Sequence, residues 1–135
     1  MKVKSNMEKY VIDASALLTF FLPDEKPTTQ IDKIIEKFSS GKCELFAPEL
    51  LKTEVGNALR SCVLRKRMPK KRALDLFEKF LLLEVNYEDV NLKKALSLSI
   101  KYNISLYDGI YAYLAKSRRV PLLTRDSKLN KLLNS

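Results

Sequence analysis

The sequence predicts an α/β fold: a short, twisted parallel sheet of about four strands flanked by helices, in a single domain over residues 1–135. Short apolar runs alternate with longer amphipathic segments, a pattern typical of a parallel sheet covered on both faces. A length of 135 residues with 46% hydrophobic content suits one globular core. No repeat, low-complexity tract or linker divides the chain, so we expect one domain.

The first half of the chain predicts two strands and three helices. The strands are expected at 10–12 and 43–48, and the helices at 14–22, about 28–39 and 48–67. Pro23 and Asp24 end the first helix, since proline cannot continue one. The second helix carries isoleucines at helical spacing and stops at Gly41, while Pro48 suits the first turn of the third.

The second half continues the alternation. Helices are expected at 69–83, 89–103, 105–119 and 127–134, and strands at 83–87 and 120–124. Pro69 suits a helix start, so the third and fourth helices of the chain form a hairpin with residues 65–72 at its tip.

Composition excludes several kinds of chemistry. The chain has no histidine, which excludes imidazole ligands and His-dependent triads, and three glycines leave no glycine-rich phosphate loop. Cys43 and Cys62 are too few for a disulfide framework. No apolar run approaches the ~18 residues of a membrane span, and the first residues lack a secretory core, so we expect a cytoplasmic protein that does not enter membranes.

Four acidic residues stand in apolar surroundings. Asp13 and Asp126 follow the first and fourth predicted strands, at the sheet edge where parallel sheets hold ligands. Glu54 and Asp108 lie on apolar faces of predicted helices. Carboxylates gathered in one cleft raise one another's pKa unless cations neutralise them, and oxygen ligands without histidine suit Mg²⁺ or Mn²⁺.

Each acid also has a purely structural explanation. Asp13 and Asp126 could cap helices, Asp108 is expected to cap the helix that it begins, and Glu54 could pair with a nearby Lys or Arg. The joint placement of the four favours a shared site. The hydroxyls of Ser15 and Thr124, two residues from Asp13 and Asp126, are expected to orient these acids.

A basic stretch, RKRMPKKR, covers residues 65–72. With no acid among them, its six cations account for most of the net charge of +9. The cations are Arg65, Lys66, Arg67, Lys70, Lys71 and Arg72. We expect this basic tip to contact RNA phosphates; the alternative is a solvated turn between helices.

The stretches VIDASALL, PELLKTEVGNAL, SLYDGIYAYLA and LLTRDSKL carry the four acids in order. In this order and spacing the chain resembles the PIN-domain ribonucleases, and most closely the VapC toxins of toxin–antitoxin pairs. The resemblance covers essentially the whole chain. It departs from the usual pattern at Gly109, where the family usually has Ala, and at Tyr113, where a smaller aliphatic residue is common.

The resemblance implies a metal-dependent endoribonuclease that hydrolyses RNA phosphodiester bonds. Asp13, Glu54, Asp108 and Asp126 would bind one or two Mg²⁺ or Mn²⁺ ions, supported by Ser15 and Thr124. It further implies a toxin with a cognate antitoxin, and a homodimer in which LLTFFL, residues 17–22, supplies part of the interface.

Two other functions remain open from the sequence. One is an RNA-processing nuclease without an antitoxin, and the other is a non-catalytic RNA-binding module in which the acids are caps. A receiver domain is disfavoured because it needs paired acids after the first strand, and Asp13-Ala14 offers a single one. A phosphatase with a D-x-D motif is disfavoured because Ser15 stands where its second acid would be.

Overall fold

The computed structural model describes residues 7–22 and 29–134, and these form one parallel sheet surrounded by helices. The strands are β1 (Glu8–Ile12), β2 (Cys43–Pro48), β3 (Asn86–Glu88) and β4 (Leu122–Leu123). The helices are α1 (Ala14–Phe21), α2 (Thr29–Ser39), α3 (Leu50–Leu64), α4 (Lys70–Leu81), α5 (Leu92–Tyr102), α6 (Leu106–Arg118) and α7 (Ser127–Asn134). The predicted α/β class and the short parallel sheet are confirmed. The predicted break at Pro23 and Asp24 lies outside the described residues.

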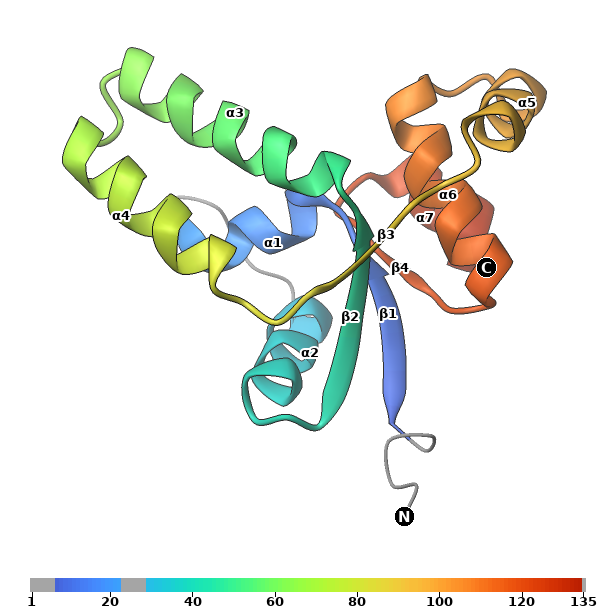
Figure 1. Cartoon of the computed structure of the whole chain (residues 1–135), viewed down its shortest axis with the longest axis horizontal. Helices are drawn as coiled ribbons and strands as arrows, with labels where there is room; N and C mark the ends of the chain where they lie inside the picture. The colour runs from blue at the N-terminus through green and yellow to red at the C-terminus, as the bar shows by residue number, and fades with distance from the viewer. Residues whose placement is uncertain (1–6, 23–28, 135) are drawn as a thin grey trace.

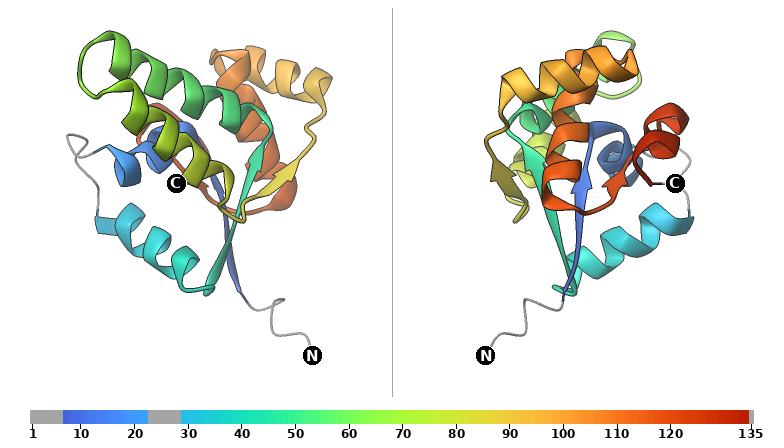
Figure 2. Two further views of the ribbon diagram at one scale, coloured as in Figure 1. Left: turned by 60° about the vertical axis from the view of Figure 1, so that its left-hand side comes forward. Right: turned by 90° about the vertical axis from the view of Figure 1, so that its right-hand side faces the viewer.

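The strand order β3-β2-β1-β4 puts the first two strands at the centre of the sheet. All three strand pairs are parallel, so the carboxyl ends of the strands point the same way (Figure 1). Helix α6 packs against β1, β2 and β4, and α2 packs against β2 from the opposite side (Figure 2). Within the described residues, no helix has the length and apolar character needed to cross a membrane.

The core lies between the central strands and the helices on either side. Val11, Ile12, Leu45 and Ala47 of β1 and β2 have no exposed surface. Strands buried on both faces in this way read as continuous apolar runs, which is why the sequence predicted them without an alternating pattern. Helix α6 supplies the buried Tyr111, Leu114 and Ala115 to the same core.

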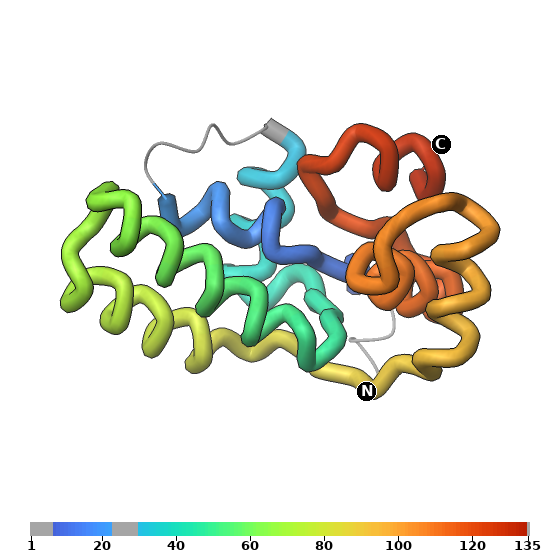
Figure 3. The backbone as a smooth tube through the Cα atoms, turned by 90° about the horizontal axis from the view of Figure 1, so that it is seen from above, coloured from blue at the N-terminus to red at the C-terminus, as the bar shows by residue number. Residues whose placement is uncertain are grey.

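Helices α3 and α4 form the predicted hairpin, and its tip lies at the opposite end of the molecule from α5 (Figure 3). Several predicted boundaries were shifted by one to three residues; the strand expected at 83–87, for example, is Asn86–Glu88. Pro48 is the last residue of β2, paired with Glu88 of β3, and not in the first turn of α3. Helix α3 ends at Leu64, before the predicted residue 67, because Lys66 adopts a positive φ of 59° that a right-handed helix excludes.

Gly109 allows α5 and α6 to approach each other closely. A Cβ atom at this position would lie 2.8 Å from the carbonyl oxygen of Ala95 and 2.9 Å from the Cβ atom of Ser99, both in α5. Both distances are shorter than an ordinary contact, and the carbonyl belongs to a helix that cannot yield locally. The departure from the family pattern at this position therefore has a packing reason.

Gly109→Ala is expected to lower the free energy of unfolding by about 1 kcal/mol or more, because overpacking outweighs the gain in helix propensity. Urea unfolding followed by circular dichroism measures this change. Gly56→Ala is the matched control, since its Cβ would meet only the Phe77 ring, at 3.3 Å, and that ring can shift. The control should be as stable as the parent or more so. A Gly109→Ala variant of parental stability would contradict the close approach.

Candidate active site

The candidate site lies at the carboxyl ends of β1 and β4, which are neighbours in the sheet. Asp13 directly follows β1, and its backbone N–H donates to the carbonyl of Leu123 in β4 at 3.1 Å. Asp126 comes three residues after β4 and directly before α7. The parallel sheet thus brings together two acids that are more than a hundred residues apart in the sequence, as the rule for ligand sites in such sheets predicts.

Asp13 is both a helix cap and a buried acid. Its carboxylate accepts from the backbone N–H of Ala16 at 3.1 Å, which makes it the N-cap of α1. It also accepts from the hydroxyl of Ser15 at 2.7 Å. Only 8% of Asp13 is exposed. The structural explanation for this acid is therefore correct, and it does not exclude a second role.

The hydroxyl groups of Ser15 and Thr124 connect Asp13 to Asp126. The Oγ of Ser15 lies 3.4 Å from the Oγ1 of Thr124 and accepts from the backbone N–H of Arg125 at 2.9 Å. Thr124 accepts from the backbone N–H of Asp126 at 3.0 Å. Asp126 in turn accepts from the N–H of Leu129 at 3.0 Å and so caps α7. The chain of bonds holds both strand ends in a fixed relation.

The other two acids come from helices. Glu54 lies in the second turn of α3, half-buried, and accepts from the Tyr111 hydroxyl at 2.7 Å. The hydrogen-bond partner of Glu54 is thus Tyr111, whereas the structural explanation from the sequence had a nearby Lys or Arg. Asp108 lies in the first turn of α6 but is not its cap: Ser105 is the N-cap and accepts from the backbone N–H of Asp108 at 3.0 Å. The prediction that Asp108 caps its helix was wrong.

Burial is the largest cause of raised pKa values in this cluster. It raises the pKa of Asp13, while hydrogen bonds from Thr124, Ser15 and Ala16 lower it and the charge of Asp108 raises it further. The pKa of Glu54 is also raised, first by burial and then by the charges of Asp13 and Asp108. Both shifts show that the surroundings do not fully compensate the charged form of the carboxylate.

Asp126 is connected electrostatically to the cluster through Asp108. The pKa of Asp108 is raised by burial and by the charge of Asp126, and it is lowered by Ser105 and by the Lys128 ammonium. Asp126 thus raises the pKa of Asp108, and Asp108 raises those of Asp13 and Glu54, so each of the four predicted acids is coupled to at least one other. The structure brings all four into one electrostatic group, and a cation would relieve their repulsion.

The donor set fits a hard divalent cation, because it contains carboxylate and hydroxyl oxygens and no sulfur or imidazole. In residues 7–22 and 29–134, no three Asp, Glu, His or Cys side chains lie close enough together to be a ready-made set of ligands. The expectation of a bound divalent cation therefore rests on the type of donor atom and on the repulsion among the four acids. The ion itself stays a prediction.

The basic tip lies away from the acids. Arg65, Lys66 and Arg67 follow α3, while Lys70, Lys71 and Arg72 begin α4, and all six are exposed. Eleven residues separate Glu54 from Arg65, which corresponds to about 16 Å along a helix. The tip is therefore beyond the reach of the acidic side chains, but a ligand several nucleotides long could contact both.

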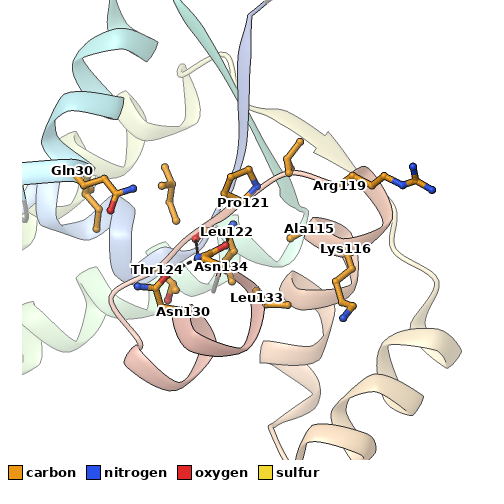
Figure 4. Close-up of a pocket in the computed structure, with 13 residues that line it drawn as sticks. Gln30, Ala115, Lys116, Arg119, Pro121, Leu122, Thr124, Asn130, Leu133 and Asn134 are labelled. Carbon is orange, nitrogen blue, oxygen red and sulfur yellow. Dashed lines mark hydrogen bonds between the residues drawn. The ribbon is translucent and has the colours of Figure 1, made fainter.

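A cavity of about 770 Å³ lies beside β4, lined by residues of α2, α6, β4 and α7 (Figure 4). Thr124 is in its wall, but none of the four acids is. Asn134 also lines this cavity and binds the edge of β4. Its side chain accepts from the backbone N–H of Leu122 at 3.1 Å and donates to the carbonyl of Leu122 at 2.8 Å. The cavity and the acidic cluster are thus separate features.

Sequence reasoning missed three residues at this site: Tyr111, Ser105 and Lys128. A signal for Tyr111 was present, because a tyrosine on a buried helix face needs a partner for its hydroxyl, and Tyr111 shares a face with Asp108. Lys128 contacts the junction of α5 and α6, where its Nζ donates to the carbonyl of Asn103 at 3.0 Å. Nothing in the local sequence pointed to that contact.

Two curated relatives resemble the chain over most of its length. "Ribonuclease VapC3" of Pyrobaculum aerophilum is 31% identical over 125 residues, covering 90% of this chain and 92% of the relative. "Ribonuclease VapC1" of Mycobacterium tuberculosis is 28% identical over 124 residues, covering 91% and 90%.

Solved structures and a family model point the same way. PAE2754 from Pyrobaculum aerophilum matches with a TM-score of 0.69 at 24% identity, covering 90% of this chain and 82% of that one. FitAcB from Neisseria gonorrhoeae matches with a TM-score of 0.64 at 13% identity, covering 93% of each. At these identities the two structures show a shared fold. Residues 10–132, which contain all four acids, match the sequence model described as PIN domain, and the chain therefore belongs to the PIN domain family.

Proposed function

We propose that this chain is a Mg²⁺- or Mn²⁺-dependent endoribonuclease and the toxin component of a toxin–antitoxin pair. The observation that carries the proposal is the electrostatic group of Asp13, Glu54, Asp108 and Asp126 at the carboxyl end of the sheet. Two relatives that match 90% and 91% of the chain are named as ribonucleases, which supports this activity for the chain.

In this proposal the four acids hold one or two ions, while Ser15 and Thr124 fix the orientation of the acids at the strand ends. A bound ion would lower the pKa of a water molecule for attack on phosphorus and stabilise the negative charge that develops on the phosphate. The caps of α1 and α7 hold Asp13 and Asp126 on the ends of helices, so that each carboxylate keeps its place without an ion. Burial of Asp13 keeps bulk water from screening its charge.

The basic tip contributes affinity for the RNA backbone. Its six exposed cations are dense enough to neutralise several phosphates, which gives binding that depends on salt and little on sequence. Because Glu54 lies on α3 and the basic tip follows the end of α3, an RNA strand bound at the tip would extend along this helix toward the site. Cleavage and binding would then depend on different residues.

An antitoxin and a homodimer are further parts of the proposal. The predicted interface at residues 17–22 has little support, since Leu17 and Leu22 are buried and Phe20, at 51% exposed, is the one large apolar side chain that the stretch presents to solvent. A larger apolar stripe lies on α5, where Leu92, Leu96 and Ile100 are exposed at a spacing of four residues. A homodimer interface on α5 therefore fits the structure better than one at residues 17–22.

Asp13→Asn separates a metal site from a helix cap, because asparagine keeps the capping ability and removes the charge. We expect RNA cleavage to fall by about two orders of magnitude or more, since an ion would lose a charged ligand. Cleavage of defined RNAs with Mg²⁺, Mn²⁺ or EDTA measures this, and Asp108→Asn should give the same pattern. Parental cleavage rates in both variants would instead favour the non-catalytic RNA-binding module.

The same Asp13→Asn variant should be at least as stable as the parent in EDTA. The folded-state pKa of Asp13 is raised, so its ionisation lowers folding stability as the pH rises through that pKa, and asparagine removes this loss. Millimolar Mg²⁺ or Mn²⁺ should raise the melting temperature of the parent and raise that of the variant much less. If neither ion changed the melting temperature of the parent, the result would contradict the metal site.

Replacing Lys70, Lys71 and Arg72 by Ser should weaken RNA binding and flatten its salt dependence, because fewer phosphate contacts release fewer counterions. The preferred cleavage site should not change. A titration of labelled RNA at several salt concentrations measures the slope. Replacing Lys9 in β1, Lys33 in α2 and Lys42 directly before β2 by Ser removes the same charge outside the basic tip and should leave the slope at the parental value. If the salt dependence of RNA binding had the same slope in both triple variants, the basic tip would be solvated surface with no particular role in RNA binding.

A further inference from the structure

Tyr111 connects the two helices that carry Glu54 and Asp108. Its hydroxyl donates to the Oε1 of Glu54 at 2.7 Å, and only 2% of the residue is exposed. Asp108 precedes it by three residues, so Asp108 and Tyr111 lie on the same face of α6. One hydrogen bond therefore relates the acid of α3 to the acid of α6.

The Tyr111 hydroxyl is a permanent donor. Burial and the neighbouring Glu54 carboxylate raise the pKa of Tyr111 far above its ordinary value, so the phenol keeps its proton at any physiological pH. The same bond lowers the pKa of Glu54, against the opposing effect of burial. A carboxylate accepts several hydrogen bonds or ligand contacts, so a single bond to Oε1 leaves Glu54 with further acceptor capacity.

The other acids are held in a different way. Asp13 and Asp126 are joined through Ser15 and Thr124, which connect β1 to the segment between β4 and α7. Those bonds do not include α3. The Tyr111–Glu54 bond therefore supplies the connection that brings the α3 acid into a fixed relation with α6, which itself packs against β1 and α7.

We propose that Tyr111 is a positioning residue that holds the Glu54 carboxylate in place for a divalent cation, an inference that rests on the proposed function. Groups that orient a metal ligand commonly change metal affinity by about 10- to 100-fold when they are removed. Tyr111 does not touch the ion or the RNA in this account. It acts through Glu54 alone.

The test is the Mn²⁺ affinity of the full chain with Tyr111→Phe, measured as free Mn²⁺ by electron paramagnetic resonance. The variant loses one oxygen atom, and its Mn²⁺ dissociation constant should rise by about 10- to 100-fold. Tyr87→Phe is the matched control, because the Tyr87 hydroxyl is buried without a hydrogen-bond partner among the described residues. Its affinity should stay within about twofold of the parent.

A double-mutant cycle with Glu54→Gln shows whether Tyr111 acts through Glu54. In the Glu54→Gln background, Tyr111→Phe should change the Mn²⁺ dissociation constant by less than about twofold. An equally large loss in that background would overturn the inference, as would a Tyr111→Phe single variant that binds Mn²⁺ like the parent. A parent that binds no Mn²⁺ would overturn the proposed function together with the inference, whereas a parent that binds while Tyr111→Phe has no effect overturns the inference alone.

Discussion

The repulsion among carboxylates gathered at one end of the sheet, where Asp13 is buried and Glu54 and Asp108 are partly buried, is the constraint on which this structure depends. Asp13, Glu54 and Asp108 each have a pKa raised by burial, and the charges of neighbouring acids raise them further. A protein selected only for stability would not gather these groups, because ionisation of Asp13, Glu54 or Asp108, whose pKa values are raised, lowers the stability of the fold. The clustering of these acids is explained if a bound cation neutralises them in the active protein.

The surrounding structure reduces this cost without removing it. Asp13 and Asp126 accept backbone N–H groups as caps of α1 and α7, so the positive ends of two helices face the site. Hydroxyls of Ser15 and Tyr111 donate to Asp13 and Glu54. Helix capping and metal binding are therefore compatible uses of the same acids, and the two explanations that the sequence left open need not compete.

The sequence predicted most of the fold, because buried parallel strands and amphipathic helices leave clear patterns. It failed where a local signal had two meanings: Pro48 suits a helix start as well as a strand end, and tertiary pairing with β3 decided between them. Among the site residues, the four acids and two hydroxyls stood out by position. Tyr111 was missed, because its buried position indicates that its hydroxyl needs a partner, but helix periodicity cannot identify that partner as Glu54, 57 residues away in the sequence.

The central claim is that the acidic cluster binds a divalent cation, and the position of Mn²⁺ in a crystal tests it most directly. Crystals of the parent protein soaked in Mn²⁺ would be measured with X-rays near the manganese absorption edge. The account predicts one or two anomalous peaks at the carboxyl ends of β1 and β4, with carboxylate oxygens of Asp13 and Asp108 among the nearest protein atoms. A saturating soak that gives no peak there, or peaks only elsewhere on the surface, would contradict it.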